Sequence, residues 1–226
     1  MSCLIILFQA CKKDPTIWEI KNLSENKINV VGHGGMGIKY KYPMNSMKSL
    51  NEVLLLGAFG TEMDVRLTKD SVLVLCHASD LKDATDYTGE IESKTWQEIE
   101  NVKYNQPLFN RSRLISAESF FNQVKNPSLY LFVFDCKLGS SESEELNQRF
   151  ARALSKLVVT YSLVNNSFIE SFNYKFLNAI SNHLPKVKLF VYCDRLNDAL
   201  DLKKVCGCTP FIFERVGDVL ALKKVR

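Results

Sequence analysis

The chain has 226 residues, of which 46% are hydrophobic and 24% are charged. This composition and length are ordinary for one globular domain, and they exclude collagen-like, low-complexity and disordered chains. The 29 Lys and Arg residues nearly balance the 25 Asp and Glu residues, so the net charge of +4 gives no reason to expect a nucleic-acid partner. The chain also lacks an apolar run of the roughly 18 residues that a membrane-spanning helix needs.

The first 11 residues resemble a bacterial lipoprotein signal. An apolar stretch from Leu4 to Phe8 leads into Ala10 and then Cys11, and an apolar segment ending in small residues is typical of an export signal. The resemblance implies acylation of Cys11, with an exported lipoprotein in the periplasm or cell envelope and the lipid as its only membrane contact. Residues 12–26 would then form a polar tether. The alternative is a frayed apolar N-terminus.

From residue 27 onward, predicted strands alternate with predicted helices. We predict strands at 27–32, 61–67, 72–76, 129–134, 166–170, 187–193, 210–213 and 219–222. We predict helices at 47–56, 117–124, 142–159, 174–184 and 197–205, with a short amphipathic segment at 95–99. This order predicts a parallel α/β fold, either a barrel or a doubly wound sheet. Residues 27–226 show no internal repeat or long linker, which indicates a single domain.

Polar residues collect at the ends of the first four predicted strands. In chain order they are His33, Glu62 with Asp64, His77, and Asp135 with Lys137. In a parallel barrel, the carboxyl ends of the strands form the rim on which active sites are built. The sequence therefore predicts one site that contains all six residues.

Glu62 and Asp64 are two residues apart, so on a strand both side chains point to the same face. Two buried carboxylates on one face repel each other unless a proton or a cation lies between them. We therefore predict a metal site with Asp135 as its third ligand, and carboxylate ligands favour Mg²⁺ or Ca²⁺. The alternatives are a solvated strand face for the pair and a helix N-cap for Asp135. Lys137 is expected on the same face as Asp135, where it could hold an anion near the metal.

The histidines are candidates for proton transfer. Neutral imidazole titrates near physiological pH, so His33 and His77 could act as general acid and general base. A lone histidine at a strand end is usually structural, but two that flank a carboxylate pair favour catalysis.

Two other motifs are weaker. The spacing of Gly32, Gly34 and Gly37 fits a dinucleotide-binding loop, but Pro43 arrives before a helix could follow it. The Cys206-Gly-Cys208 pair is too close for the usual zinc spacing and has no second pair.

Taken together, several segments are similar to motifs of the glycerophosphodiester phosphodiesterase family. In chain order these are Val31-Gly-His33-Gly, Pro43-Met-Asn45-Ser46, Glu62-Met-Asp64-Val-Arg-Leu-Thr-Lys-Asp70, Leu73-Val-Leu-Cys-His77, Phe134-Asp135-Cys-Lys137 and Glu170-Ser171-Phe172-Asn173. The resemblance covers about residues 28–195. It implies a TIM barrel that hydrolyses a glycerophosphodiester to glycerol 3-phosphate and an alcohol with one divalent cation, Ca²⁺ or Mg²⁺.

The resemblance also assigns roles to the predicted site. Glu62, Asp64 and Asp135 would bind the metal, and His33 and His77 would be the acid and base. Lys137 would stabilise negative charge on the phosphoryl oxygens.

The chain departs from the family in three places. Gly34 stands where the family has an arginine, Met44 where it has a glutamate, and Asp135 where it has a longer carboxylate. Lys39, Lys41 and Arg66 are candidates to replace the lost positive charge. The C-terminal strand and helix of the barrel also look short or atypical, since residues 219–222 are the last candidate strand.

Two other functions remain open at this stage. One is a related phosphodiesterase or phospholipase that acts on another phosphodiester, which the glycine at position 34 favours. The other is a non-catalytic lipoprotein that binds phosphodiesters, which the presence of both His33 and His77 disfavours.

Overall fold

The structure is a computed structural model. It describes residues 29–37, 42–105, 112–139, 141–193, 209–216 and 219–224, with backbone alone from residue 193 onward. Several predictions fall outside these residues and stay predictions: the signal and acylation at Cys11, the tether at 12–26, Lys39, Lys41, the helix at 197–205 and the Cys206–Cys208 pair. No described helix has the length and apolar character to cross a membrane.

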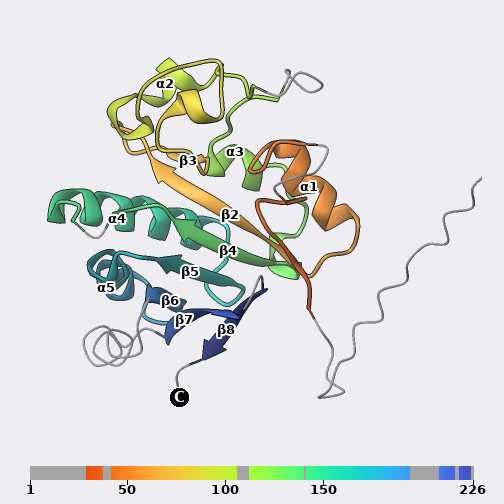
Figure 1. Cartoon of the computed structure of the whole chain (residues 1–226), viewed down its shortest axis with the longest axis vertical. Coiled ribbons are helices and arrows are strands. Elements are labelled where there is room, and N and C mark those ends of the chain that lie inside the picture. Colours follow the sequence, from red (N-terminus) through yellow and green to blue (C-terminus); the bar gives the residue numbers. More distant parts are fainter. Residues whose placement is uncertain are drawn as a thin grey trace, which may run out of the picture.

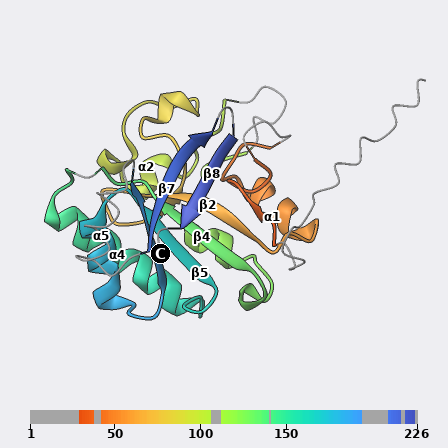
Figure 2. The same cartoon turned by 60° about the horizontal axis from the view of Figure 1, so that its bottom comes forward.

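The centre of the fold is a single curved sheet (Figures 1 and 2). Its parallel strands, in spatial order, are β1 (Val31–Gly32), β2 (Gly60–Leu67), β4 (Leu131–Cys136), β5 (Ser167–Ser171), β6 (Lys188–Cys193) and β7 (Thr209–Val216). The predicted parallel sheet is therefore confirmed, and so is the alternation of strands and helices in the described residues between 31 and 193.

Helices and short 3-10 turns connect these strands (Figure 1). The helices are α1 (Met47–Leu55), α2 (Trp96–Ile99), α3 (Ala117–Phe121), α4 (Glu144–Thr160) and α5 (Tyr174–His183). The 3-10 turns are Leu81–Asp83, Ile91–Ser93 and Pro127–Leu129. Serine hydroxyls cap three of the helices, and at α4 the Ser143 side chain accepts from the Leu146 N–H, with Glu144 and Glu145 in the first turn. A hydroxyl cap and early acidic residues both stabilise a helix N-terminus.

The strand β3 (Leu73–Leu75) corrects one sequence expectation. Residues 72–76 were expected to form the third barrel strand, with His77 at its carboxyl end on the rim, but β3 pairs antiparallel with β2, its Leu75 opposite Val65. The reason is the length of the connection, because a parallel neighbour needs a crossover of a dozen or more residues and only a short turn joins β2 to β3. Ser71 takes a left-handed φ of 67° in that turn. The third barrel strand is therefore β4.

The last strand, β8 (Val219–Lys224), is also antiparallel. It pairs with β7, with Val216 opposite Val219. Only two residues separate β7 from β8, which is the loop length of a tight hairpin. The strand order of the described residues thus runs from β1 at one end to β8 at the other, and the expected irregularity of the C-terminal barrel strand is present as this hairpin.

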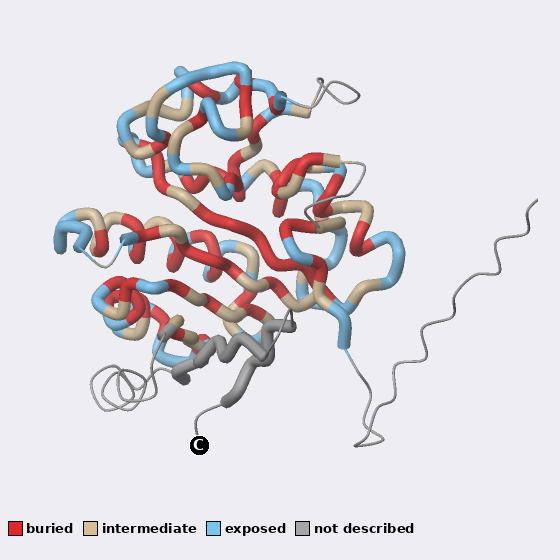
Figure 3. Tube along the Cα trace, viewed as in Figure 1, coloured by how far each residue is buried: buried red, intermediate tan, exposed pale blue. Residues whose placement is uncertain are grey.

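The main core lies between the parallel sheet and its helices. β2 is buried along almost its whole length (Figure 3). The interior of this core holds an aromatic group in which Phe121 contacts Phe132 edge to face, with ring centroids 4.9 Å apart. Phe120 and Phe134 complete the group and are fully buried. A second, smaller core lies under the segment 76–104 and includes Leu81, Ile91 and Ile99.

Phe132 tests the importance of the aromatic group. Replacing Phe132 with Ala leaves a cavity beside Phe121 and should lower the free energy of unfolding by about 3–5 kcal/mol. Leu129, which is 70% exposed, is the control. Leu129→Ala should change the free energy of unfolding by less than about 0.5 kcal/mol. Urea unfolding measures both. A loss below about 1 kcal/mol for Phe132→Ala would contradict this core assignment.

Candidate functional site

Three carboxylates meet on the inner face of the sheet. The alternation of β2 turns Met63 and Val65 toward the helices and Glu62 and Asp64 to the other side. The parallel register of β2 with β4 sets Asp135 directly opposite Asp64. One oxygen from each of the three carboxylates lies within 4.8 Å of the others. The structure therefore brings the three predicted metal ligands together.

All three carboxylates are buried. Asp64 has no exposed surface, and Glu62 and Asp135 are each 9% exposed. This excludes the solvated strand face as an explanation for Glu62 and Asp64. Asp135 is also not a helix N-cap, because the following helix α4 is capped by Ser143.

Two residues between β1 and α1, Gly34 and Asn45, hold the first two carboxylates in place. The Asn45 side chain donates from Nδ2 to Asp64 Oδ2 at 2.7 Å and accepts the Asp64 backbone N–H at 3.0 Å. The Gly34 backbone N–H donates to Glu62 Oε2 at 2.6 Å. Asn45 takes a left-handed φ of 61°, a conformation that asparagine adopts more readily than most residues. Sequence reasoning quoted Asn45 only as part of a motif and gave it no role.

Lys137 neutralises part of the carboxylate charge. Its Nζ lies 2.8 Å from Asp64 Oδ1 and 2.5 Å from Asp135 Oδ2. Burial lowers the pKa of Lys137, but Asp135 and Asp64 outweigh it and raise this pKa above its ordinary value. The ammonium therefore stays charged. Two carboxylates thus contact the ammonium, and the expected role of Lys137 toward a separate anion stays a prediction.

The remaining negative charge makes the cluster a good fit for a cation. Burial raises the pKa of Glu62 to about 8, and the nearby Asp64 charge adds to this shift. Burial also raises the pKa of Asp135, although Lys137 opposes the shift. Glu62 Oε1 is buried and has no hydrogen-bond partner among the described residues. Three carboxylate oxygens with one of them unpartnered match the ligand preference of Mg²⁺ or Ca²⁺.

The two predicted catalytic histidines lie at the edge of this cluster. His33 follows β1 directly, its side chain is 62% exposed, and its Nε2 lies 4.0 Å from Glu62 Oε2. His77 is exposed and follows β3, and its electrostatic influence reaches Asp135. The antiparallel β3 brings His77 back along β2 to this place, since the Cys76 N–H donates to the Asp64 carbonyl. The argument that His77 reaches this place at the end of a barrel strand is therefore corrected, because the antiparallel β3 brings it here.

A fourth, half-buried carboxylate lies beside the cluster. Glu170 on β5 lies opposite Asp135 on β4. Burial raises its pKa to about 7, while a hydrogen bond from the Tyr192 hydroxyl lowers it. Sequence reasoning missed Glu170 as a site residue, although it ends a strand as the predicted ligands do.

No described residue is seen to replace the family arginine at position 34. Gly34 has a φ of +57°, and a Cβ there would lie 2.7 Å from the Met44 side chain, so the position admits no larger residue without rearrangement. The Arg66 guanidinium does not supply the lost charge, because Glu92 Oε1 lies 2.8 Å from its Nη1. The other two candidate replacements, Lys39 and Lys41, lie outside the described residues.

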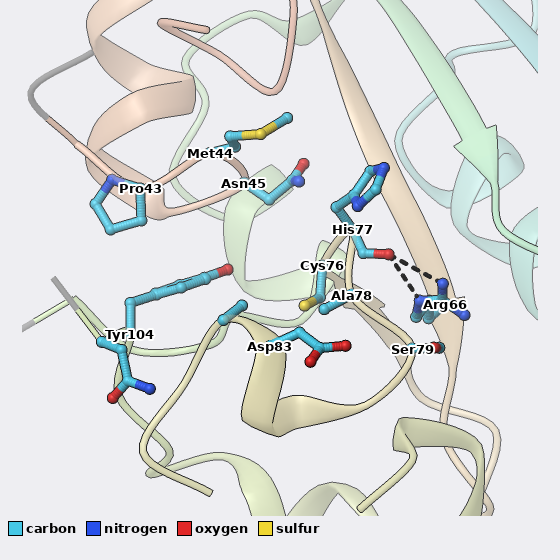
Figure 4. Close-up of a pocket in the computed structure, with 12 residues that line it drawn as sticks. Pro43, Met44, Asn45, Arg66, Cys76, His77, Ala78, Ser79, Asp83 and Tyr104 are labelled. Atoms are coloured by element: carbon cyan, nitrogen blue, oxygen red, sulfur yellow. Dashed lines mark hydrogen bonds between the residues drawn. The ribbon is translucent and has the colours of Figure 1, made fainter. Parts of the chain in front are cut away.

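A cavity of about 550 Å³ opens beside His77 (Figure 4). Met44 and Asn45 line one wall, and the segment after β3 lines the other, including Asp83 and Tyr104. Figure 4 shows the Asn45 amide and the His77 imidazole on the same side of this space. The cavity thus lies next to Asn45, which holds Asp64, and it is large enough for a small organic group.

Comparison with known proteins identifies the family. Residues 36–211 match the model of the Glycerophosphoryl diester phosphodiesterase family. The chain belongs to this family. A glycerophosphodiester phosphodiesterase of Bacillus altitudinis is 22% identical over 158 residues, which cover 69% of this chain and 63% of the relative. One from Caldanaerobacter subterraneus subsp. tengcongensis is 25% identical over 167 residues, 72% of this chain and 65% of the relative. The chain thus spans slightly less than two thirds of these curated relatives.

Solved structures of the family share the fold. A glycerophosphodiester phosphodiesterase of Parabacteroides distasonis superposes with a TM-score of 0.65 at 23% identity, covering 84% of each chain. A phosphodiesterase of Oleispira antarctica, in complex with the product sn-glycerol-3-phosphate, gives a TM-score of 0.69 at 18% identity and covers 80% of this chain and 73% of its own. These likenesses confirm the predicted TIM-type barrel.

The raised pKa values predict a pH-dependent stability of the metal-free protein. The folded state binds more protons than the unfolded state between the ordinary pKa of Glu62, 4.5, and its folded pKa of about 8. Stability should therefore fall as pH rises through this window, and Asp135 and Glu170 act in the same direction.

Thermal unfolding in EDTA at a series of pH values from about 5 to 9 checks this expectation. Glu62→Gln resembles the protonated carboxyl and should flatten the profile. Added Ca²⁺ or Mg²⁺ should raise the Tm of the unmodified protein more at high pH than at low pH, because ligand carboxylates bind ionised. A Tm that rises with pH in EDTA would contradict the assigned shift.

Proposed function

We propose that this protein hydrolyses glycerophosphodiesters to glycerol 3-phosphate and an alcohol, with a divalent cation bound by Glu62, Asp64 and Asp135. The observation that carries the proposal is the convergence of these three buried carboxylates at one point. Membership of the glycerophosphoryl diester phosphodiesterase family supports it.

When bound, the cation supplies Lewis-acid stabilisation of the charge that develops on phosphoryl oxygens. The residues around it keep the ligands in place. Asn45 orients Asp64 through two hydrogen bonds, and the Gly34 N–H orients Glu62. Lys137 bridges Asp64 and Asp135 and keeps a positive charge beside these two ligands. The carboxylates are therefore arranged before substrate arrives, which lowers the cost of reorganisation.

The two histidines are proposed to move the protons. Hydrolysis of a phosphodiester needs one group that takes a proton from the attacking oxygen and one that gives a proton to the departing alcohol. His77 lines the 550 Å³ cavity, so we assign the alcohol to this cavity and the donation of its proton to His77. His33, which follows β1 and lies next to Glu62, is then the acceptor.

A second phosphodiester substrate is the alternative function. The observation that favours it is Gly34, whose backbone conformation and contact with Met44 leave no side chain to grip the phosphate at this position. A substrate with an additional charge or a larger alcohol would compensate for that loss by contacts elsewhere.

The test follows product release from glycerophosphocholine, glycerophosphoethanolamine and a non-glycerol phosphodiester such as bis(p-nitrophenyl) phosphate. We expect glycerol 3-phosphate from the first two, stopped by EDTA and restored by Ca²⁺ or Mg²⁺. Turnover of the third substrate alone would support the alternative function. A folded protein that binds the cation and turns over none of them would support a binding role and overturn the proposal.

Variants of the histidines test the assigned roles. His77→Ala and His33→Ala should each reduce kcat by at least about 100-fold, because general acid–base catalysis contributes on that scale, while the Tm gain on adding Ca²⁺ stays close to that of the unmodified protein. Asp64→Ala should lose both turnover and the Tm gain. His183→Ala is the matched control, since this histidine ends α5 and is exposed. A near-normal kcat for His77→Ala would contradict its assignment.

A further inference from the structure

Arg66 forms a clamp on the segment that carries His77. Its side chain lies on β2, on the same side as Glu62 and Asp64. The guanidinium donates twice to the His77 backbone carbonyl, from Nη2 at 2.9 Å and from Nε at 3.2 Å, as Figure 4 shows. A longer contact of 3.5 Å joins Nη1 to the carbonyl of Lys137. One side chain thus contacts the backbones of two residues that the proposed mechanism uses.

The guanidinium is fixed in this position. Its Nη1 donates to Glu92 Oε1 at 2.8 Å, and the Arg66 side chain is only 12% exposed. Glu92 belongs to the 3-10 turn at Ile91–Ser93, so this ion pair also attaches the segment after β3 to the barrel strand. A planar guanidinium can make these contacts together, which a lysine ammonium cannot do with the same geometry.

His77 has few other restraints. Its imidazole is exposed and makes no hydrogen bond of its own to any described residue. The ladder of β3 with β2 ends just before it, at the Cys76 N–H. The position of the imidazole therefore depends on the backbone from which it extends, and Arg66 holds that backbone.

We propose that Arg66 is a positioning residue that sets the place of the His77 imidazole relative to the three carboxylates. The expected effect on turnover rests on the proposed function. The positioning of His77 by Arg66 does not depend on that function. Displacement of a catalytic group by about 1 Å can reduce the rate on the order of 100-fold. Loss of the clamp should therefore lower kcat and leave cation binding intact, because Arg66 makes no hydrogen bond or ion pair with Glu62, Asp64 or Asp135.

The chain offers a matched control. Arg149 on α4 makes the same kind of contact, donating to the backbone carbonyls of Lys69 at 2.7 Å and Thr68 at 3.3 Å. These carbonyls lie at the β2–β3 turn rather than at His77. Arg149→Ala therefore removes a guanidinium clamp on backbone without releasing the His77 segment.

The experiment compares Arg66→Ala, Arg66→Lys and Arg149→Ala in the full chain. We expect Arg66→Ala to lower kcat on the order of 10- to 100-fold with KM changed little and with an unaltered Tm gain from Ca²⁺. Arg66→Lys should recover part of the loss, and guanidinium chloride below denaturing concentration should partly rescue Arg66→Ala, whereas NaCl at equal ionic strength should not. Arg149→Ala should keep the unmodified kcat. If the unmodified protein turns over substrate, equal kcat values for Arg66→Ala and Arg149→Ala would overturn the proposal.

Histidine NMR separates this proposal from the proposed function. The chain has three histidines, so ring-labelled protein gives an assignable spectrum. In Arg66→Ala the His77 ring signals should shift and broaden while those of His33 and His183 stay in place, and guanidinium should reverse the change. This result would support the clamp even if no glycerophosphodiester is turned over. Unchanged His77 signals would overturn it, whatever the activity.

Discussion

The structure depends on the burial of three carboxylates at one point between β2 and β4. Glu62 and Asp64 share a strand face, and the parallel register adds Asp135 opposite Asp64. Burying like charges this close is unfavourable unless protons, hydrogen-bond donors or a cation compensate for them. The neighbouring residues of the site supply part of this compensation.

The protein itself supplies only part of the compensation. Asn45 and the Gly34 N–H donate hydrogen bonds to the cluster, and Lys137 contributes one positive charge. One carboxylate oxygen, Glu62 Oε1, remains without a donor among the described residues, and the pKa of Glu62 is raised to about 8. The site therefore lacks positive charge. A bound divalent cation, or protonation of the carboxylates in its absence, can compensate for this. Binding of a cation at this place is the feature that links the fold to the proposed chemistry.

The sequence predicted the parts of the site that follow from periodicity. Alternation along a strand places Glu62 and Asp64 together, and the strand-end rule for parallel sheets brings Asp135 to them. The alternating strands and helices likewise predicted the parallel sheet. Counting β3 among the barrel strands was wrong, because an apolar pattern locates a strand but gives neither its direction nor its pairing partner. The short turn at residues 69–71 was the available signal for an antiparallel pair.

Contacts between distant segments lay beyond sequence reasoning. The hydrogen bonds from Asn45 to Asp64 and from Arg66 to His77 join elements whose spacing in the chain has no periodic relation. The pairing of Lys137 with two carboxylates depends on the register of β2 and β4 in the same way. A motif can indicate that such residues matter, but only the folded arrangement shows which carbonyl or carboxylate each one contacts.

The most direct test of the central claim is to locate a bound metal by diffraction. Crystals grown with Mn²⁺, which takes the same oxygen ligands as Mg²⁺, would be measured for anomalous scattering. The account predicts one peak in coordination distance of Glu62, Asp64 and Asp135. A cluster without a peak at saturating Mn²⁺, with Lys137 still bridging Asp64 and Asp135, would contradict it.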